Sequence, residues 1–288
     1  AAASKALRIL LEEGALPART PQPQPSFAER TDDPRVRQAL ALQPHTQASI
    51  GVSEGVRTAL IERGFAPDKC LAIPNGIALA RFAPLRALRP AEPPPVLCLI
   101  GRVVPIKDVK TFIRAMRRVV NRMPAAEGWI AGPEDEDKAY AAECHALVRS
   151  LGLENHVRFL GFQKVEDLMP KIGLTILSSI SEALPLVILE GYAAGVPTVS
   201  TDVGSCRQLV EGLDEADRAI GPSGAIVNIA DPQALADAAV ALLADGEAWQ
   251  AASRAGIARV ERYYTDRMMF DRYRQVYAGA FARCPEAR

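Results

Sequence analysis

The amino-acid sequence predicts an α/β protein built on a doubly wound parallel sheet. From Val96 onward, short apolar runs alternate with amphipathic helical segments, and the apolar runs are nearly continuous. A continuous apolar strand is typical of a parallel sheet that helices cover on both faces. The 288 residues, of which 49% are hydrophobic, can bury the core of one large domain or two smaller ones.

The segment before Val96 is less regular. We expect a short helix ending at Gly14, an extended proline-rich linker, and a helix with Pro34 near its first position, from the sequences SKALRILLEEG, PARTPQPQPS and DDPRVRQALAL. The stretch TQASIGVS predicts a strand leading into a helix over Ser53 to Arg63, and CLAIPNG predicts a brief strand. A second proline-rich break, RALRPAEPPP, then precedes the main sheet.

Six strands are expected in the regular part of the chain, with the sequences PVLCLIGRV, EGWIAG, HVRFLG, LTILSS, PTVSTD and GAIVNI. Helices are expected between them, among them VKTFIRAMRRVVNRM, DKAYAAECHALVRSL and DPQALADAAVALLAD. In a doubly wound sheet the ligand binds beyond the carboxyl ends of the strands. The residues that directly follow each apolar run are therefore the candidates for chemistry.

Two cations follow the first of these strands. Arg102 comes directly after Gly101, and Lys107 stands just before a helix that is expected to start near Asp108. A guanidinium, an ammonium and the free amides of a helix N-terminus together suit a phosphate or diphosphate. The alternative is that both are solvated loop residues. No G-x-G-x-x-G fingerprint follows the strand, so a dinucleotide site is not indicated.

Two carboxylates follow the fourth strand. Glu182 lies in the loop, Pro185 is expected at the first position of the next helix, and Glu190 lies about one and a half turns into it. Both acids would face one cleft and could accept sugar hydroxyls. Alternatively, Glu182 caps the helix and Glu190 pairs with a cation on its exposed face. The apolar and small neighbours in LVILEGYAAG argue against that second role for Glu190.

The composition excludes several classes of function. Lys plus Arg equals Asp plus Glu at 34 each, so no overall charge recruits nucleic acid or an anionic membrane. The apolar runs are far shorter than the roughly 20 residues that span a bilayer, and the N-terminus lacks a signal-peptide pattern, so a cytoplasmic protein is expected. The five cysteines and three histidines show no metal-ligand spacing.

The strings GRVVPIK and SEALPLVILEGYAAGVPTVSTDVGSCRQLV resemble the donor-binding domain of retaining GT-B glycosyltransferases whose two glutamates are separated by seven residues, glycosyltransferase family 4. The chain is most similar to the PelF-type bacterial exopolysaccharide enzymes, through SISEALPLVILE, TDVGSCRQLVEG and GRVVPIKDVKTFIRAM. The resemblance covers Ile50 to Phe281. It implies a partial N-terminal, acceptor-side segment with a linker (1–90), a Rossmann-like nucleotide-sugar donor domain (91–264) and a C-terminal crossover helix (265–288).

The resemblance also implies roles for individual residues. Arg102 and Lys107 match the pair that holds the donor diphosphate and stabilises it as leaving group, Glu182 matches the acid at the transferred hexose, and these three are the expected catalytic residues. The expected donor-binding residues are Arg102, Lys107, Phe162, Val165, Glu182, Leu184, Leu186 and Glu190. Glu190 would accept ribose hydroxyls, and the stretch from Phe162 to Val165 would cup the base. Many relatives carry a glycine-rich turn between the glutamates, where this chain has Ala183, Leu184 and Pro185.

The function implied by the resemblance is transfer of a hexose from a UDP-sugar, with UDP-glucose as the expected donor, to a growing exopolysaccharide. The expected partners are the UDP-sugar, a saccharide acceptor and a membrane polysaccharide-synthesis complex bound peripherally, without nucleic acid. The alternative is a catalytically silent nucleotide-sugar-binding module, because about 90 residues before the main sheet are few for a complete acceptor domain.

No cofactor or metal is expected for this reaction. Asp135, Glu136 and Asp137 nominally match the D-x-D metal motif of a different glycosyltransferase fold. Acids at the first turn of a helix are equally expected from the helix dipole. The terminal stretch ERYYTDRMMFDRYRQVYAGAF predicts one amphipathic helix, whose aromatic face is either exposed or packed against residues 34–64.

Overall fold

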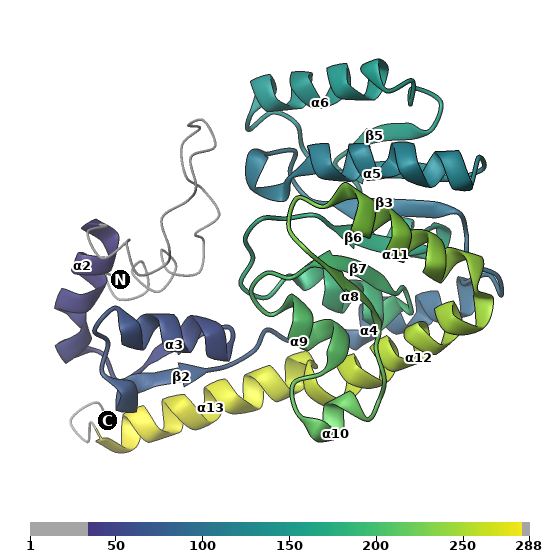
Figure 1. Ribbon diagram of the computed structural model, residues 1–288. Helices are drawn as coiled ribbons and strands as arrows, with labels where there is room; N and C mark the ends of the chain where they lie inside the picture. The colour runs from purple at the N-terminus through teal and green to yellow at the C-terminus, as the bar shows by residue number, and fades with distance from the viewer. Residues whose placement is uncertain (1–33, 284–288) are drawn as a thin grey trace. The chain divides into compact units, whose positions relative to one another are not determined.

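The computed structural model of the protein describes residues 34–283 (Figure 1). Of these, residues 76–266 form one compact unit, and residues 34–75 with 267–283 form another. The helix predicted in SKALRILLEEG and the extended linker predicted in PARTPQPQPS lie outside the described residues. The domain boundaries expected near residues 90 and 264 stay predictions.

The larger unit is built on a six-stranded sheet in which every pair of neighbouring strands is parallel, with the order β5-β4-β3-β6-β7-β8. The strands are β3 (Val96–Ile100), β4 (Glu127–Ala131), β5 (Val157–Gly161), β6 (Leu174–Leu177), β7 (Thr198–Thr201) and β8 (Gly224–Val227). All six predicted strands are confirmed. Every residue of β6 and β7 is buried, so both faces of the sheet are covered there, and the predicted doubly wound α/β fold is confirmed.

The helices of this unit are α4 (Leu79–Phe82), α5 (Val109–Arg122), α6 (Lys138–Ser150), α7 (Val165–Leu168), α8 (Leu186–Ala194), α9 (Cys206–Glu211), α10 (Glu215–Arg218), α11 (Pro232–Ala244) and α12 (Gly246–Tyr263). Several begin after an aspartate whose side chain accepts a hydrogen bond from the helix backbone, which satisfies one of the amides left free at a helix start. These aspartates are Asp108, Asp137, Asp214, Asp231 and Asp245.

The main core lies between the sheet and the helices α5, α6 and α11. Phe112 and Met116 of α5, Leu97 of β3 and Ile130 of β4 are completely buried in it. Helix α11 packs against α5, and α12 packs against α8. The amphipathic pattern of α5 explains this placement, because its apolar side chains recur at helical spacing on one side.

The strand order reverses at one place in the sheet, between β3 and β6. From β3 the chain moves outward to β4 and β5, and then crosses back to β6 on the other side of β3 (Figure 1). Helical connections therefore leave β3 and β6 in opposite directions. A crevice opens between the carboxyl ends of two such strands, and ligands of doubly wound proteins bind there.

The smaller unit contains α2 (Pro34–Leu42), β1 (Ser49–Gly51), α3 (Glu54–Glu62), β2 (Cys70–Ala72) and most of α13 (Asp266–Arg283). Strands β1 and β2 pair in parallel. The two helices and two strands predicted for this segment are confirmed, and the first strand is limited to Ser49–Gly51 within TQASIGVS. Of the aromatic side chains of α13, Phe270, Tyr277 and Phe281 are at least half exposed.

The single terminal helix predicted over ERYYTDRMMFDRYRQVYAGAF is wrong in one respect, because it is interrupted between α12 and α13. Tyr264 leaves the helical conformation, with φ −132° and ψ 36°. Its carbonyl accepts a hydrogen bond from Ile77 N at 2.8 Å, and Asp266 N donates to Ile77 O at 3.1 Å. Backbone pairing with Ile77 replaces the helical hydrogen bonds, which side-chain periodicity does not reveal.

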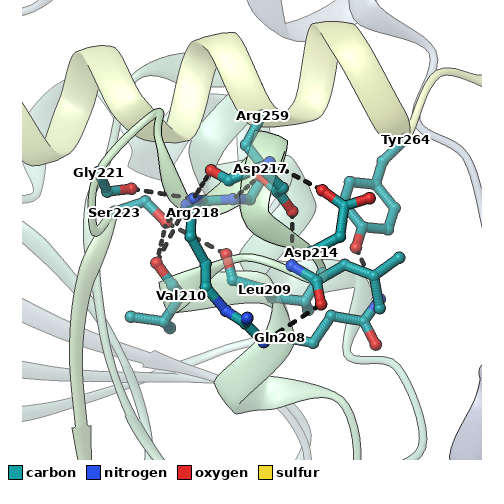
Figure 2. Close-up of polar contacts among 11 residues, drawn as sticks. Gln208, Leu209, Val210, Asp214, Asp217, Arg218, Gly221, Ser223, Arg259 and Tyr264 are labelled. Carbon is teal, nitrogen blue, oxygen red and sulfur yellow. Dashed lines mark hydrogen bonds and ion pairs between the residues drawn. The ribbon is translucent and has the colours of Figure 1, made fainter.

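A buried ion pair ties α12 to α10 (Figure 2). Arg259 Nε donates to Asp217 Oδ1 at 2.7 Å, and neither side chain has any exposed surface. The remaining guanidinium N–H groups donate to Ser223 Oγ and to the carbonyls of Val210, Asp217 and Gly221. The guanidinium is thus saturated with acceptors, as a buried charge requires.

Candidate functional site

Lys107 is held at the carboxyl end of β3. A 3₁₀ turn, Pro105–Lys107, follows the strand, and Asp108 then adopts the left-handed conformation, with φ 43°, as it caps α5. Aspartate tolerates this conformation better than most residues. The Lys107 side chain lies back across the strand end, because a methyl group on Gly101 would be 3.5 Å from Lys107 Cε.

The loop after β6 meets Lys107 across the crevice. Lys107 Nζ lies 2.6 Å from Glu182 Oε1, and the two side chains are 22% and 14% exposed. Ser179 Oγ donates to the same carboxylate oxygen at 2.7 Å. Ser178 Oγ donates to the carbonyl of Lys107, and Ile180 N donates to Ile106 O, both at 2.9 Å. The β3 and β6 loops are therefore joined where the strand order reverses.

The loop after β7 supports Glu182 from the other side. Gly204 has φ 53°, and a Cβ at this position would lie 2.1 Å from the carbonyl oxygen of Glu182. Only glycine allows that approach. Ser205 N donates to Ala183 O at 3.0 Å, and Thr201 Oγ1 donates to Ser179 O at 2.6 Å. The end of β7 and the loop that follows it therefore hold the backbone around Glu182 in place.

Arg102 points to a different partner. Its Nη1 lies 2.7 Å from both carboxylate oxygens of Glu136, which follows β4. Both side chains are more than one third exposed. The structure thus brings Lys107 and Glu182 into contact but places Arg102 in a separate ion pair at the next strand end.

Glu190 is a half-buried acid in an apolar helix. Within residues 34–283 it makes no hydrogen bond through its side chain and no ion pair, so the pairing with an exposed cation considered above is wrong. Burial raises the pKa of the Glu190 carboxyl, Arg81 lowers it and Glu166 raises it. Arg81 of α4 and Glu166 of α7 form an ion pair with each other, in which Arg81 Nε donates at 3.1 Å.

The start of α8 differs from the expectation. Pro185 is the residue before the helix rather than its first residue, because its ψ of 117° is extended and the helix begins at Leu186. Within the described residues no side chain caps this N-terminus, so the alternative in which Glu182 caps α8 is also wrong. Leu184 is buried and Leu186 is 45% exposed.

The loop after β5 presents an exposed aromatic ring. Phe162 is 81% exposed and follows Gly161, whose φ of 62° turns the chain away from the strand. Val165 begins α7, the same short helix that carries Glu166. No contact in the described part of the chain joins Phe162 or Val165 to Lys107 or Glu182, and their part in a ligand site stays a prediction.

Metal-binding groups do not gather in the described part of the chain. Among residues 34–283, no group of three or more His, Cys, Asp or Glu side chains could hold a metal ion. Asp137 of the nominal D-x-D motif caps α6, and Glu136 pairs with Arg102. His145 lies 2.6 Å from Glu134 and its ring is 3.8 Å from that of Phe159.

None of the helices within the described residues is both long and apolar enough to cross a membrane.

Several residues at these strand ends were not predicted. Ser179, which donates to Glu182, is the second residue after β6, so the rule that ligands bind at carboxyl ends could have identified it. The closeness of Gly204 to Glu182 has no local signal in the sequence. The same is true of Arg81 and Glu166, which lie 85 residues apart.

Curated relatives match more than half of the chain. The chain is 30% identical over 194 residues to a D-inositol 3-phosphate glycosyltransferase of Catenulispora acidiphila, which covers 62% of this chain and 44% of the relative. It is 33% identical over 212 residues to an exopolysaccharide phosphotransferase of Streptomyces coelicolor, which covers 72% of this chain and 20% of the relative. The chain spans less than half the length of these two relatives.

Solved structures share the fold. Anabaena HepE in complex with UDP and glucose superposes with a TM-score of 0.73 at 22% identity, over 85% of this chain and 66% of that chain. Sucrose-phosphate synthase of Thermosynechococcus elongatus gives a TM-score of 0.71 at 25% identity, over 86% of this chain and 62% of that chain. The Rossmann-like sheet therefore matches those of GT-B glycosyltransferases. Residues 94–245, more than half of the chain, match the family described as glycosyl transferases group 1, and the chain belongs to this family.

Proposed function

We propose that the chain holds the nucleotide-sugar donor half of a retaining glycosyltransferase. The observation that carries this proposal is the Lys107–Glu182 pair, in which a cation and a carboxylate meet at the crevice between β3 and β6. A sugar nucleotide needs both kinds of group, a cation for the diphosphate and an acceptor for sugar hydroxyls. Membership of the glycosyl transferases group 1 supports the same assignment.

The proposed role of Lys107 follows from the charge that develops in the reaction. As the bond between the sugar and the diphosphate breaks, negative charge grows on the diphosphate and positive charge grows on the sugar ring. A fixed ammonium near the diphosphate stabilises this state more than the ground state, which lowers the barrier. The first-turn amides of α8, which no side chain caps, would add donors at the same edge.

Glu182 and Arg102 complete the proposed hexose and diphosphate contacts. Ser179 and Lys107 orient the carboxylate of Glu182, which would accept hydroxyls of the transferred hexose. Arg102 would exchange its exposed partner Glu136 for the diphosphate. In this mechanism the acceptor attacks from the side of the leaving group, and the departing phosphate takes the acceptor's proton. No protein nucleophile is then needed.

The nucleoside half of the donor is assigned to the neighbouring residues. Glu190 would accept the ribose hydroxyls, because it is a half-buried carboxylate without a side-chain partner among the described residues. Backbone groups of Leu184 and Leu186 would contact the donor, and the loop from Phe162 to Val165 would surround the base. We propose UDP-glucose as donor, supported by the HepE complex with UDP and glucose.

We assign the sugar acceptor to exopolysaccharide synthesis. The relative named as an exopolysaccharide enzyme supports this assignment. A cytoplasmic location, peripheral association with a membrane complex and independence from metal stay predictions.

A second candidate function is a silent nucleotide-sugar-binding module. The observation in its favour is that the family match, residues 94–245, is confined to the part that carries the candidate donor site.

Calorimetric titration with UDP tests the proposal. We expect Lys107→Ala to weaken UDP binding at least about tenfold, since it removes one charge-assisted contact. Lys110→Ala is the matched control, because this lysine lies in the first turn of α5, three residues after Lys107, but pairs with Glu143 of α6. Equal UDP affinity in wild type and Lys107→Ala would remove the diphosphate assignment.

Two further measurements separate the candidate functions. Glu182→Gln should keep UDP affinity and lose the discrimination between UDP and UDP-glucose. Consumption of UDP-glucose by the wild type, unchanged by EDTA, supports the transferase. Binding without any turnover supports the silent module.

A further inference from the structure

A second concave surface lies at the opposite edge of the main sheet. It encloses about 250 Å³ and is lined by residues that include Arg86, Arg89, Trp249, Gln250, Ser253 and Arg254, which we call the amino-edge pocket. Gly195, which also lines it, ends α8 just before β7 begins. Trp249 Nε1 donates to the carbonyl of Gly173, directly before β6. The pocket is therefore at the amino ends of the strands, away from the crevice that holds Lys107.

Two arginine side chains of the pocket are held in place by hydrogen bonds to backbone carbonyls. Arg86 Nε donates to Ala193 O at 2.8 Å, and its Nη1 lies 2.6 Å from Glu261. Arg89 Nη1 donates to the carbonyls of Met169 and Ile172, both at 2.7 Å. The Arg89 guanidinium also lies 4.9 Å from the centre of the Trp249 ring. These contacts fix the direction of both guanidinium groups without using all of their donors.

Each of the two anchored guanidinium groups keeps a buried nitrogen without an acceptor. In Arg86 and in Arg89, Nη2 is shielded from solvent and makes no hydrogen bond to any residue between 34 and 283. Leaving a buried donor unpaired is unfavourable, the more so when the group is charged. Burial also lowers the pKa of Arg89 to about 10. Two arginines that line the pocket thus hold buried donors whose hydrogen-bonding capacity the described residues do not meet.

The charge around the pocket is unbalanced. Arg254 is exposed, and within residues 34–283 its side chain has no hydrogen bond or ion pair. Among the described residues, Arg86 is the one of these three arginines that contacts a carboxylate, that of Glu261. Ser253 and Gln250 add polar groups on the same face of α12, and both also bond to backbone carbonyls. An anion with several acceptor oxygens would compensate the excess charge.

We propose that the amino-edge pocket binds a phosphate or diphosphate group, carried either by a small molecule or by a lipid headgroup. Planar guanidinium forks match the oxygens of phosphate, and three arginines line a space larger than one water molecule here. This site is independent of the proposed donor site, which lies at the other edge of the sheet.

Inorganic pyrophosphate is the first probe. Because the candidate donor site also attracts diphosphate, calorimetry is done on a chain that carries Lys107→Ala. We expect this variant to bind pyrophosphate, and the added change Arg254→Gln to weaken binding about tenfold. The matched control is Arg262→Gln, which removes the same charge from an exposed position of α12 outside the pocket.

Three results would overturn the proposal. They are absence of pyrophosphate binding, no effect of Arg254→Gln, and an equal effect of Arg262→Gln, which would indicate a general charge effect. Loss of binding in Lys107→Ala itself would assign the diphosphate to the donor site alone. Arg254 is exposed, so we expect its variant to keep the thermal midpoint of the wild type, and that measurement accompanies the titration.

Vesicles distinguish the two sources of phosphate. Sedimentation with phosphatidylglycerol vesicles, and with phosphatidylcholine vesicles as control, is compared for wild type and Arg254→Gln. Binding to the anionic vesicles that depends on Arg254 identifies a lipid headgroup. Pyrophosphate binding without vesicle binding identifies a soluble phosphate. Failure of both probes contradicts the site, whatever the outcome of the UDP titrations.

Discussion

Two ion pairs in the larger unit differ in how completely their charges are satisfied. Arg259 and Asp217 have no exposed surface, and every guanidinium N–H of Arg259 has an acceptor (Figure 2). Lys107 and Glu182 are 22% and 14% exposed, and in the described chain the Lys107 ammonium contacts only Glu182. The first pair has no donor to offer a ligand. The second pair keeps N–H groups free at a crevice, which is the arrangement that a binding site requires.

The place of each pair in the topology explains the difference. Asp217 and Arg259 come from α10 and α12, and their network also includes the carbonyls of Val210 and Gly221 around β8. This network therefore joins α10 and α12 to each other. Lys107 and Glu182 come from loops that follow adjacent parallel strands. Such loops meet at the strand ends, and these two side chains stay partly exposed there.

The largest expected effect is on stability. Asp217→Ala leaves Arg259 buried without its carboxylate, and we expect the free energy of unfolding to fall by about 3–5 kcal/mol. Denaturation in urea measures it. Arg207→Ala is the control, because it removes two exposed ion pairs, with Asp202 and Glu211, and exposed pairs contribute little. If both variants lose the same small amount, the buried network is not the structural element that this comparison assigns to it.

The second prediction concerns Glu190, whose burial opposes its ionisation. Because its folded pKa is raised above the ordinary value, the folded state binds the proton more tightly than the unfolded state. Stability therefore falls as pH rises from the ordinary pKa to the raised one, and stays lower above it. We expect Glu190→Gln to be more stable than wild type at pH 7 and equal to it well below the ordinary pKa, as measured by urea denaturation across pH.

The same substitution should weaken UDP binding about tenfold, since a neutral amide is a poorer acceptor for ribose hydroxyls. Glu154→Gln, at an exposed position, is the control and should change neither property. A variant that gains stability and keeps its UDP affinity would show that Glu190 is strained for some reason other than the donor.

The sequence predicted the sheet because burial on two faces leaves a local pattern, the continuous apolar run. It predicted Lys107 and Glu182 as candidates because both lie in the loops that follow such runs. It could not predict that Arg102 pairs with Glu136, since two side chains at neighbouring strand ends compete for partners and the outcome depends on strand order. The pairs Arg259–Asp217 and Arg81–Glu166 also escaped prediction, because their partners lie on separate segments and no periodicity links them.

The smallest expected effect tests whether the Arg102–Glu136 pair restrains the candidate site. Glu136→Gln releases Arg102 from an exposed ion pair of the kind that contributes up to about 1 kcal/mol, so UDP affinity should rise about two- to fivefold by calorimetry. Asp135→Asn is the matched control, because it removes the same charge one residue earlier, at an exposed position. An equal rise in both variants would mean that UDP affinity depends on the overall negative charge near the site, not on the Arg102–Glu136 pair. In a chain that also carries Arg102→Gln, the gain from Glu136→Gln should disappear, because the cation that it releases is no longer present.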